Sequence, residues 1–213
     1  MQFPQLSEKT NHCKICFQPI EKNSFHSLLS KEPTICHDCL LKLKPVLRTF
    51  YLDDVECFHV YYYTSNIQQL LYQFKGCRDY ELKSTFFEYY SPYLNLKFKG
   101  YTIIPAPSFR KSDEERGFNH VEEMFKFLKL EVKKIIHKTK EIKQADLTTK
   151  EREKIGKILT IDDIDLSKKK ILLVDDVFTT GSTIKSMIKL VKEKGAKKVK
   201  VLLLSKTIDL EKR

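Results

Sequence analysis

The 213-residue sequence lacks the features that would place it in or across a membrane. Its longest apolar runs, such as 171–174 and 201–204, are far shorter than the ~20 residues a spanning helix needs. The N-terminus, Met1-Gln2-Phe3-Pro4, shows no basic segment followed by an apolar one, so nothing marks the chain for secretion. We therefore expect a cytoplasmic protein without a transmembrane segment, whose only contact with membranes would be peripheral.

The sequence also has no internal repeat and no low-complexity tract. Hydrophobic residues make up 41% of it, which is enough to bury a core and excludes a wholly disordered chain. At this length we expect one medium-sized domain, or a small module joined to a domain of ~150 residues.

The sequence has few acidic residues for its number of basic ones. It contains 28 Asp and Glu and 39 Lys and Arg, which gives a formal net charge of +11. A surplus of this sign favours a polyanionic partner such as nucleic acid, an anionic small molecule or a membrane surface. It equally fits an ordinary soluble, lysine-rich protein from an A/T-rich genome. Charge alone selects none of these.

Four of the six cysteines form two C-x-x-C pairs, Cys13 with Cys16 and Cys36 with Cys39. In a reducing cytoplasm this spacing favours a metal over disulfides, because each turn directs two thiolates at one point. Four thiolates make a closed tetrahedral site that suits structural zinc and leaves no open position for a catalytic water. We predict one zinc ion on these cysteines and regard the other two as core or incidental thiols.

Apolar periodicity predicts strands that alternate with helices after a short N-terminal module. We expect residues 1–48 to form a metal-dependent module and 49–213 to form the main domain. The expected strands are 58–63, 101–104, 132–136, 170–174 and 197–204, and the expected helices are 65–76, 80–90, 120–130 and 183–194. Residues 137–157 are charged and weakly periodic, as a mobile loop would be. This order predicts an α/β fold with a mostly parallel twisted sheet flanked by helices, and with ligands at the carboxyl ends of the strands.

The most informative segment follows the strand predicted at 170–174. Asp175 and Asp176 stand at the carboxyl end of this strand, and small hydroxyl residues around a glycine lead straight into a helix. Backbone N–H groups at a helix N-terminus can hold a phosphate with the help of the dipole, and a glycine lets the backbone approach closely. The two acids suit vicinal ribose hydroxyls or a bound Mg²⁺.

An ordinary helix cap would explain one hydroxyl residue of this segment, but not two acids and four hydroxyls around a glycine. We therefore predict a site for a phosphorylated sugar. Its residues are Asp175, Asp176, Thr179, Thr180, Gly181, Ser182 and Thr183.

Residues 174–183 resemble the 5-phosphoribosyl-1-diphosphate (PRPP) motif of type I phosphoribosyltransferases. Together with the cysteine pairs, they resemble the ComF family, competence proteins of naturally transformable bacteria in which a phosphoribosyltransferase-like domain carries a zinc finger. Two further stretches are similar to family signatures: 71–76, with Lys75, and 104–119, with Pro105-Ala106-Pro107, Arg110 and Arg116-Gly117-Phe118-Asn119.

A third and weaker signature around Gln144, Leu147 and Arg152 departs from the family pattern. The usual Asn after the Arg is missing, and His137-Lys138 stands where the family commonly has an Arg. No role for this loop follows from the resemblance.

The resemblance implies that Asp175 and Asp176 face the ribose hydroxyls, that Thr179 to Thr183 hold the 5-phosphate, and that Mg²⁺ accompanies the diphosphate. Lys75 and Arg116 are then candidates for the diphosphate side, because their cations can neutralise it. A helix-end lysine and an exposed arginine are simpler explanations of the same residues, and Asn119 also suits a helix cap. No residue stands out as a general base, so the catalytic residues and the question of catalysis stay open.

The resemblance further implies a role in competence, in the uptake or handling of single-stranded transforming DNA, alongside a DNA helicase or a recombination mediator. Two other functions fit the same residues. One is a metabolic phosphoribosyltransferase that transfers 5-phosphoribosyl from PRPP to a base-like acceptor, and the other is a non-catalytic DNA-binding or adaptor module with a vestigial PRPP site. Aromatic residues at 61–63, 86–87 and 89–90 could stack bases or belong to the core, and the basic segments 168–170 and 192–200 could follow a phosphate backbone.

Overall fold

The computed structural model describes residues 11–20, 33–108, 110–138 and 159–208. The signature at Gln144, Leu147 and Arg152 lies outside these ranges, as do most of the expected loop at 137–157 and the side chain of Arg110.

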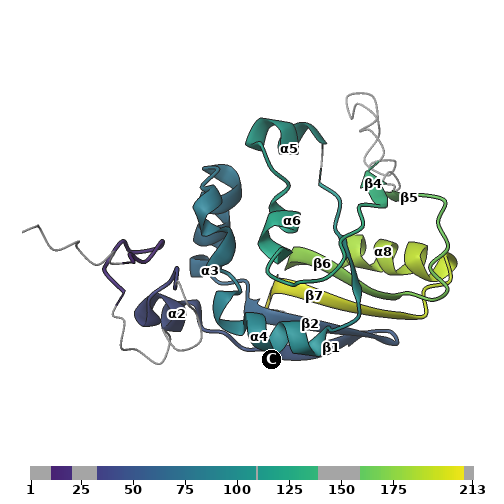
Figure 1. Ribbon diagram of the computed structural model, residues 1–213, viewed down its shortest axis with the longest axis horizontal. Coiled ribbons are helices and arrows are strands. Elements are labelled where there is room, and N and C mark those ends of the chain that lie inside the picture. The colour runs from purple at the N-terminus through teal and green to yellow at the C-terminus, as the bar shows by residue number, and fades with distance from the viewer. Residues whose placement is uncertain (1–10, 21–32, 109, 139–158, 209–213) are drawn as a thin grey trace, which may run out of the picture.

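A five-stranded sheet in the order β1-β2-β7-β6-β3 forms the centre of the molecule (Figure 1). Its strands are β1 (Arg48–Leu52), β2 (Val55–Tyr62), β3 (Thr102–Pro105), β6 (Lys170–Phe178) and β7 (Lys198–Lys206). Only β1 is antiparallel to its neighbour, and β2, β7, β6 and β3 run parallel. The predicted α/β class with a mostly parallel sheet flanked by helices is confirmed.

Several strand predictions need correction. The strand expected at 132–136 is wrong, because Val132 makes only an isolated bridge to Ile103. The strand there is β4 (Ile136–Lys138), which pairs antiparallel with β5 (Leu159–Ile161) and so removes His137 and Lys138 from the expected loop. The edge strand β1 was not predicted, and β6 extends through both acids because β7 pairs with it as far as Lys206.

Six α-helices surround the sheet in the described ranges. They are α2 (His37–Leu43), α3 (Ser65–Leu71), α4 (Ser91–Lys97), α5 (Arg110–Arg116), α6 (His120–Phe125) and α8 (Ser182–Glu193). A π-helical turn, Tyr72–Gly76, continues α3 to the glycine where the sequence predicts its end. Among these helices none has both the length and the apolar character that crossing a membrane requires.

The helix predicted at 80–90 is wrong. Two short 3₁₀ turns, Tyr80–Ser84 and Glu88–Tyr90, occupy this stretch, and α4 begins at Ser91. Pro92 sits in the first turn of α4, where its missing N–H has no partner to lose, so the proline that follows the predicted helix lies at the start of another. The stretch before the next predicted helix contains α5, which was not predicted, and α6 ends at Phe125, earlier than predicted.

Each face of the sheet carries its own apolar core. In β6, Leu172 and Val174 point into the core on the side of α3, α4 and α6, whereas Ile171 and Leu173 point into the core under α8. Tyr61, Phe86 and Phe87 are buried in the first core, which confirms the core interpretation of these aromatic residues.

The cysteine-bearing segment shares the first core. Leu40 and Leu43 of α2 belong to the same cluster as Leu70 of α3, and Asn66 donates a hydrogen bond to the Lys42 carbonyl at 2.8 Å. Figure 1 shows α2 beside α3 at one end of the molecule, with α8 toward the other end.

We expect Gly181→Ala to destabilise the fold more than Gly100→Ala. Both glycines have a positive φ, +75° and +81°, which costs an alanine about 1–2 kcal/mol. At Gly181 an added Cβ would also lie 2.4 Å from the Phe178 ring, which is buried and packs edge-on against Phe50, whereas at Gly100 it would meet nothing. Urea unfolding should show an extra loss of about 1 kcal/mol or more for Gly181→Ala; equal losses would contradict this packing constraint.

Candidate functional site

A cavity of about 400 Å³ opens at the carboxyl end of β6. It is lined by six of the residues singled out in the sequence: Lys75, Arg116, Asp175, Asp176, Thr179 and Thr183. Thr180, Gly181 and Ser182 lie in the adjoining turn and do not line the cavity. Segments from four parts of the chain thus meet where a parallel sheet places its ligands.

The two acids point to opposite sides of the sheet, because side chains alternate along a strand. Asp176 shares its side with Leu172 and Val174, and its Oδ2 atom lies 2.7 Å from Lys75 Nζ and 3.3 Å from His120 Nε2. Asp175 shares its side with Leu173, under α8, where the charge of Lys138 also acts on it. Both nevertheless border the same cavity.

The two carboxyl groups have opposite pKa shifts. Burial and the negative charge of Asp176 raise the pKa of Asp175 well above its ordinary value. Burial would also raise the pKa of Asp176, but the hydrogen bond from His120 and the charge of Lys75 outweigh it and hold that pKa below its ordinary value. The pair therefore keeps Asp176 ionised and favours a proton on Asp175.

Arg116 organises the wall of the cavity opposite the strand. Its side chain is 12% exposed, so the simpler explanation of an exposed arginine is wrong. Nε donates to the Lys75 carbonyl at 3.0 Å, and Nη1 lies 3.0 Å from His120 Nδ1. Because arginine can only donate, Nδ1 accepts, and the ring proton of His120 lies on Nε2, facing Asp176.

Sequence reasoning missed three residues of this wall. His120 follows the Arg-Gly-Phe-Asn signature directly, and its spacing of four from Arg116 was the signal available. Asp113 accepts hydrogen bonds from Arg116 Nη1 at 3.2 Å and from Asn119 Nδ2 at 2.8 Å, and Ser108 also donates to its carboxylate.

Asn119 Oδ1 accepts from the N–H of Glu122 at 2.9 Å, so its expected role as a helix cap is confirmed.

The turn before α8 has the geometry of an anion site. Gly181, at φ +75°, turns the chain into a 12-residue helix whose first N–H groups have no partner within the helix. The hydroxyl of Thr180 contacts the N–H of Ser182 at 3.4 Å and its hydroxyl at 3.3 Å. Thr179, Thr180 and Ser182 are exposed, so their hydroxyls are accessible to a ligand.

A larger cavity of about 1180 Å³ adjoins the first. The two share the segment from Ala106 to Ser108 and Lys138. Tyr80, Phe118 and Ile136 contribute apolar surface to the larger one. A ligand in the first cavity would therefore have room for a second molecule beside it.

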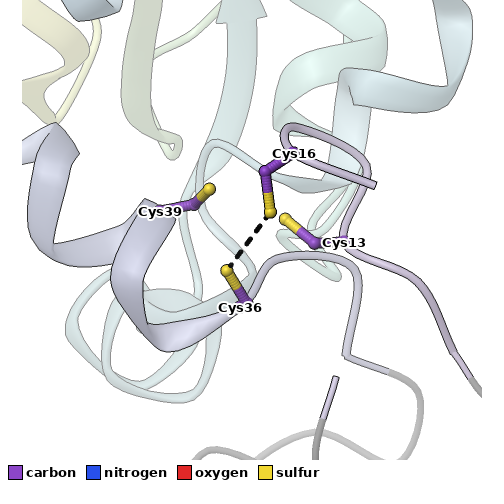
Figure 2. A group of neighbouring side chains, drawn as sticks. All are labelled: Cys13, Cys16, Cys36 and Cys39. Carbon is purple, nitrogen blue, oxygen red and sulfur yellow. Dashed lines mark hydrogen bonds between the residues drawn. The ribbon is translucent and has the colours of Figure 1, made fainter. Parts of the chain in front are cut away.

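The four N-terminal cysteines converge on one point (Figure 2). Their Sγ atoms all lie within 4.8 Å of one another, and those of Cys16 and Cys36 are 3.7 Å apart. Tetrahedral zinc with Zn–S bonds of about 2.3 Å would separate its sulfur atoms by about 3.8 Å, so the cluster fits such an ion. The N–H of Ile15 points at Cys13 Sγ from 3.4 Å, as in a metal-binding knuckle, and Cys36 stands at the start of α2.

Comparison with known proteins identifies the family. Residues 121–212 match the phosphoribosyl transferase domain family. Competence protein ComFC of Streptococcus pneumoniae is 30% identical over 197 residues, which cover 90% of this chain and 84% of that protein. The chain belongs to the ComFC family. This ComFC-family chain thus combines a phosphoribosyltransferase-type fold with a four-cysteine cluster that could bind a metal.

Solved structures with a similar fold include two phosphoribosyltransferases. Adenine phosphoribosyltransferase from Thermoanaerobacter pseudethanolicus is 17% identical, with 78% of this chain and 87% of that chain covered and a TM-score of 0.42. Purine phosphoribosyltransferase from Pyrococcus horikoshii is 24% identical, with coverage of 55% and 69% and a TM-score of 0.37.

We expect Asp175→Asn to stabilise the ligand-free protein at neutral pH but not in acid. A carboxyl whose pKa is raised by folding binds its proton more tightly in the folded state, so stability falls as the pH rises above its ordinary value of 3.8. The variant lacks this loss, and its advantage over wild type should grow from near zero at about pH 4 to several kcal/mol at about pH 7.5, at roughly 1.4 kcal/mol for each pH unit. Thermal unfolding across this range measures the difference, with the exposed Asp53→Asn as control. An advantage independent of pH would contradict the raised pKa of Asp175.

We expect the purified protein to contain about one zinc ion per chain, held by four thiolates. Elemental analysis should show that Cys16→Ser loses the metal, whereas Cys77→Ser, at an exposed cysteine outside the cluster, keeps it. A folded wild-type protein without metal would refute the assignment.

Proposed function

We propose that this chain binds PRPP together with Mg²⁺ and acts in natural competence, in the uptake or handling of single-stranded transforming DNA in the cytoplasm. One observation carries the PRPP site: the 400 Å³ cavity that joins Asp175 and Asp176, the start of α8, and the cations Lys75 and Arg116. Residues 1–48 would form a zinc module and 49–213 the phosphoribosyltransferase-type domain.

The residues present fit each part of PRPP. The turn at Thr179 to Thr183 offers N–H and hydroxyl donors to the 5-phosphate, and the two acids offer acceptors to the ribose hydroxyls. Lys75 and Arg116 face the same cavity with positive charge, as the diphosphate requires. Carboxylate oxygens are ligands that Mg²⁺ prefers, and the ion, when bound, neutralises diphosphate charge.

The ligand-free contacts suggest how the site prepares for binding. Lys75 holds the Asp176 carboxylate from one side, and the Nε2–H of His120 donates to it from the other, so Asp176 stays ionised. An ionised carboxylate of fixed orientation is a strong acceptor for a ribose hydroxyl. Arg116, through its bonds to the Lys75 carbonyl and to His120, sets the position of both partners.

The competence role is supported by the relative, whose name is competence protein ComFC, and by the net charge of +11. A DNA helicase or a recombination mediator would be the protein partner. A metabolic phosphoribosyltransferase is the second candidate, because the adjoining 1180 Å³ cavity has room for an acceptor beside the ribose.

Calorimetric titration of PRPP with Mg²⁺ tests the site. Wild type should bind, and Asp175→Ala/Asp176→Ala should lose at least tenfold in affinity, since both hydroxyl acceptors are removed. Asp163→Ala/Asp165→Ala, which removes two exposed acids on a distant turn, should bind as wild type does. Equal binding by wild type and the Asp175/Asp176 double variant would overturn the site.

Diphosphate release with a panel of base-like acceptors separates the two candidate functions. Release that depends on one acceptor would favour the metabolic enzyme over the competence role. PRPP binding without release from any acceptor would favour a competence protein that uses PRPP as a ligand.

A further inference from the structure

The sheet face on the side of α4 exposes several side chains near the amino ends of its strands. Lys170, Lys198 and Lys200 lie on this face, because they alternate in register with Leu172, Leu202 and the other residues of the first core. Glu56 of β2 is paired in register with Lys200, and Tyr51 of β1 with Glu56.

Tyr51 belongs to this face on independent grounds. Its neighbours Phe50 and Leu52 pack against the core under α8, so Tyr51 points to the opposite side. Within the described part of the chain Tyr51 is 66% exposed there. We call this surface the lysine face and define it by Tyr51, Glu56, Lys170, Lys198 and Lys200, together with Tyr93 and Lys97 of α4.

The lysine face carries a positive charge that the protein does not neutralise. Glu56 is its only acid and contacts two lysines, Lys200 at 2.6 Å and Lys97 at 3.7 Å. Lys170 and Lys198, neighbours on adjacent strands, are exposed and form no ion pair within the described part of the chain.

More lysines border this face. Lys168, Lys169 and Lys197 lie in the turns that lead into β6 and β7, and the backbone N–H of Lys197 donates to the Lys169 carbonyl at 2.9 Å. The nearby acids Asp54 and Asp163 are each already paired with a lysine of the α8 region, Lys192 and Lys194, and Glu131 lies 3.5 Å from Lys169 Nζ. The two basic segments singled out in the sequence therefore meet at one edge of the sheet.

Two exposed tyrosines stand among these cations. Tyr51 borders a hollow of about 480 Å³ whose other walls include Lys197, Lys198 and Lys200. Tyr93 is 48% exposed, packs against Phe58 at 6.2 Å between ring centroids, and has Lys97 Nζ 5.9 Å from its own ring centre. An aromatic ring that is fixed by packing but open on one side is suited to stack an unpaired base.

We propose that the lysine face binds single-stranded nucleic acid, with Tyr51 and Tyr93 stacking bases and the exposed Lys170 and Lys198 contacting phosphates. A sheet that combines exposed aromatic residues with cations suits single strands, whose bases are free to stack, better than a duplex, whose bases are not. The inference rests on the proposed role in handling single-stranded DNA, to which it adds the contact surface.

This surface is separate from the PRPP cavity. Along β6, Lys170 and Asp176 are six residues apart, which corresponds to about 20 Å at 3.3 Å per residue. The two sites therefore occupy opposite ends of the same strands, so the loss of one leaves the other intact.

Fluorescence anisotropy with a labelled oligothymidylate, measured at several salt concentrations, tests the proposal. Lys170→Ala/Lys198→Ala should weaken binding and make the slope of log affinity against log salt shallower by about 1.4, about 0.7 for each lost phosphate contact. Tyr51→Ala should weaken binding about fivefold or more with no change in slope, because stacking releases no counterions. Both variants should bind PRPP as wild type does, which also shows that they are folded.

The matched control is Lys185→Ala/Lys189→Ala, which removes the same charge from the exposed side of α8 and should leave both affinity and slope near those of wild type. If the two double-lysine variants lost equal affinity, the loss would come from the change in net charge and not from the lysine face, and the proposal would be overturned. Wild-type affinity in Tyr51→Ala, equally tight binding to a duplex, or a defect confined to anionic lipid vesicles would also overturn it. Failure of PRPP binding in wild type would count against the proposed function alone.

Discussion

The ion pair between Lys75 and Asp176 is the contact on which the arrangement of the cavity depends. At 2.7 Å it joins the end of a π-helical turn to the carboxyl end of β6, across 101 residues of sequence. His120 completes the contact from α6, and Arg116 ties the lysine's carbonyl to the histidine ring. A half-buried carboxylate without such partners would favour its protonated form, as Asp175 does. The pair therefore decides which acid carries the negative charge and where that charge points.

The parallel sheet gives its two ends different chemistry. At the carboxyl end the helix α8 begins, and its dipole and free N–H groups favour a phosphate at a single point. At the amino end the strands enter from lysine-rich turns, and their first side chains extend past the core as a row of cations on one face. The first end is suited to one compact anion held by directional bonds, and the second to an extended anion held by many screened charges. Part of the excess positive charge thus lies at each end of the sheet.

The sequence predicted those parts of the fold whose local signal agrees with their tertiary setting. The run Ile171-Leu172-Leu173-Val174, with two acids and a glycine turn after it, predicted β6, the turn and α8, because a strand buried on both faces is apolar throughout. The four cysteines converge as their spacing indicated. Other elements depend on partners far away in the chain. The edge strand β1 exposes Arg48, Thr49 and Tyr51, so it lacks an apolar signature, and Pro92 reads equally well as the end or the start of a helix. His120 gave no signal beyond its spacing from Arg116, since its contact with Asp176 reaches a carboxylate 56 residues away.

The cysteine cluster, although remote from the cavity in sequence, packs against the segment that carries Lys75 into the cavity. Cys39, Leu40 and Leu43 pack in one core with Leu71 and Phe74, and Phe74 immediately precedes Lys75. Two polar contacts reinforce this packing: Lys14 with Glu81 at 2.5 Å, and the N–H of Thr34 with Glu88 at 2.9 Å. The short cysteine-bearing segment buries little apolar surface by itself. The arrangement of its two C-x-x-C turns therefore depends on what the four thiolates hold. Whatever fixes the cysteines therefore also fixes one side of the turn that presents Lys75 to Asp176, and the cysteine cluster and the cavity at the end of β6 are parts of one packed unit.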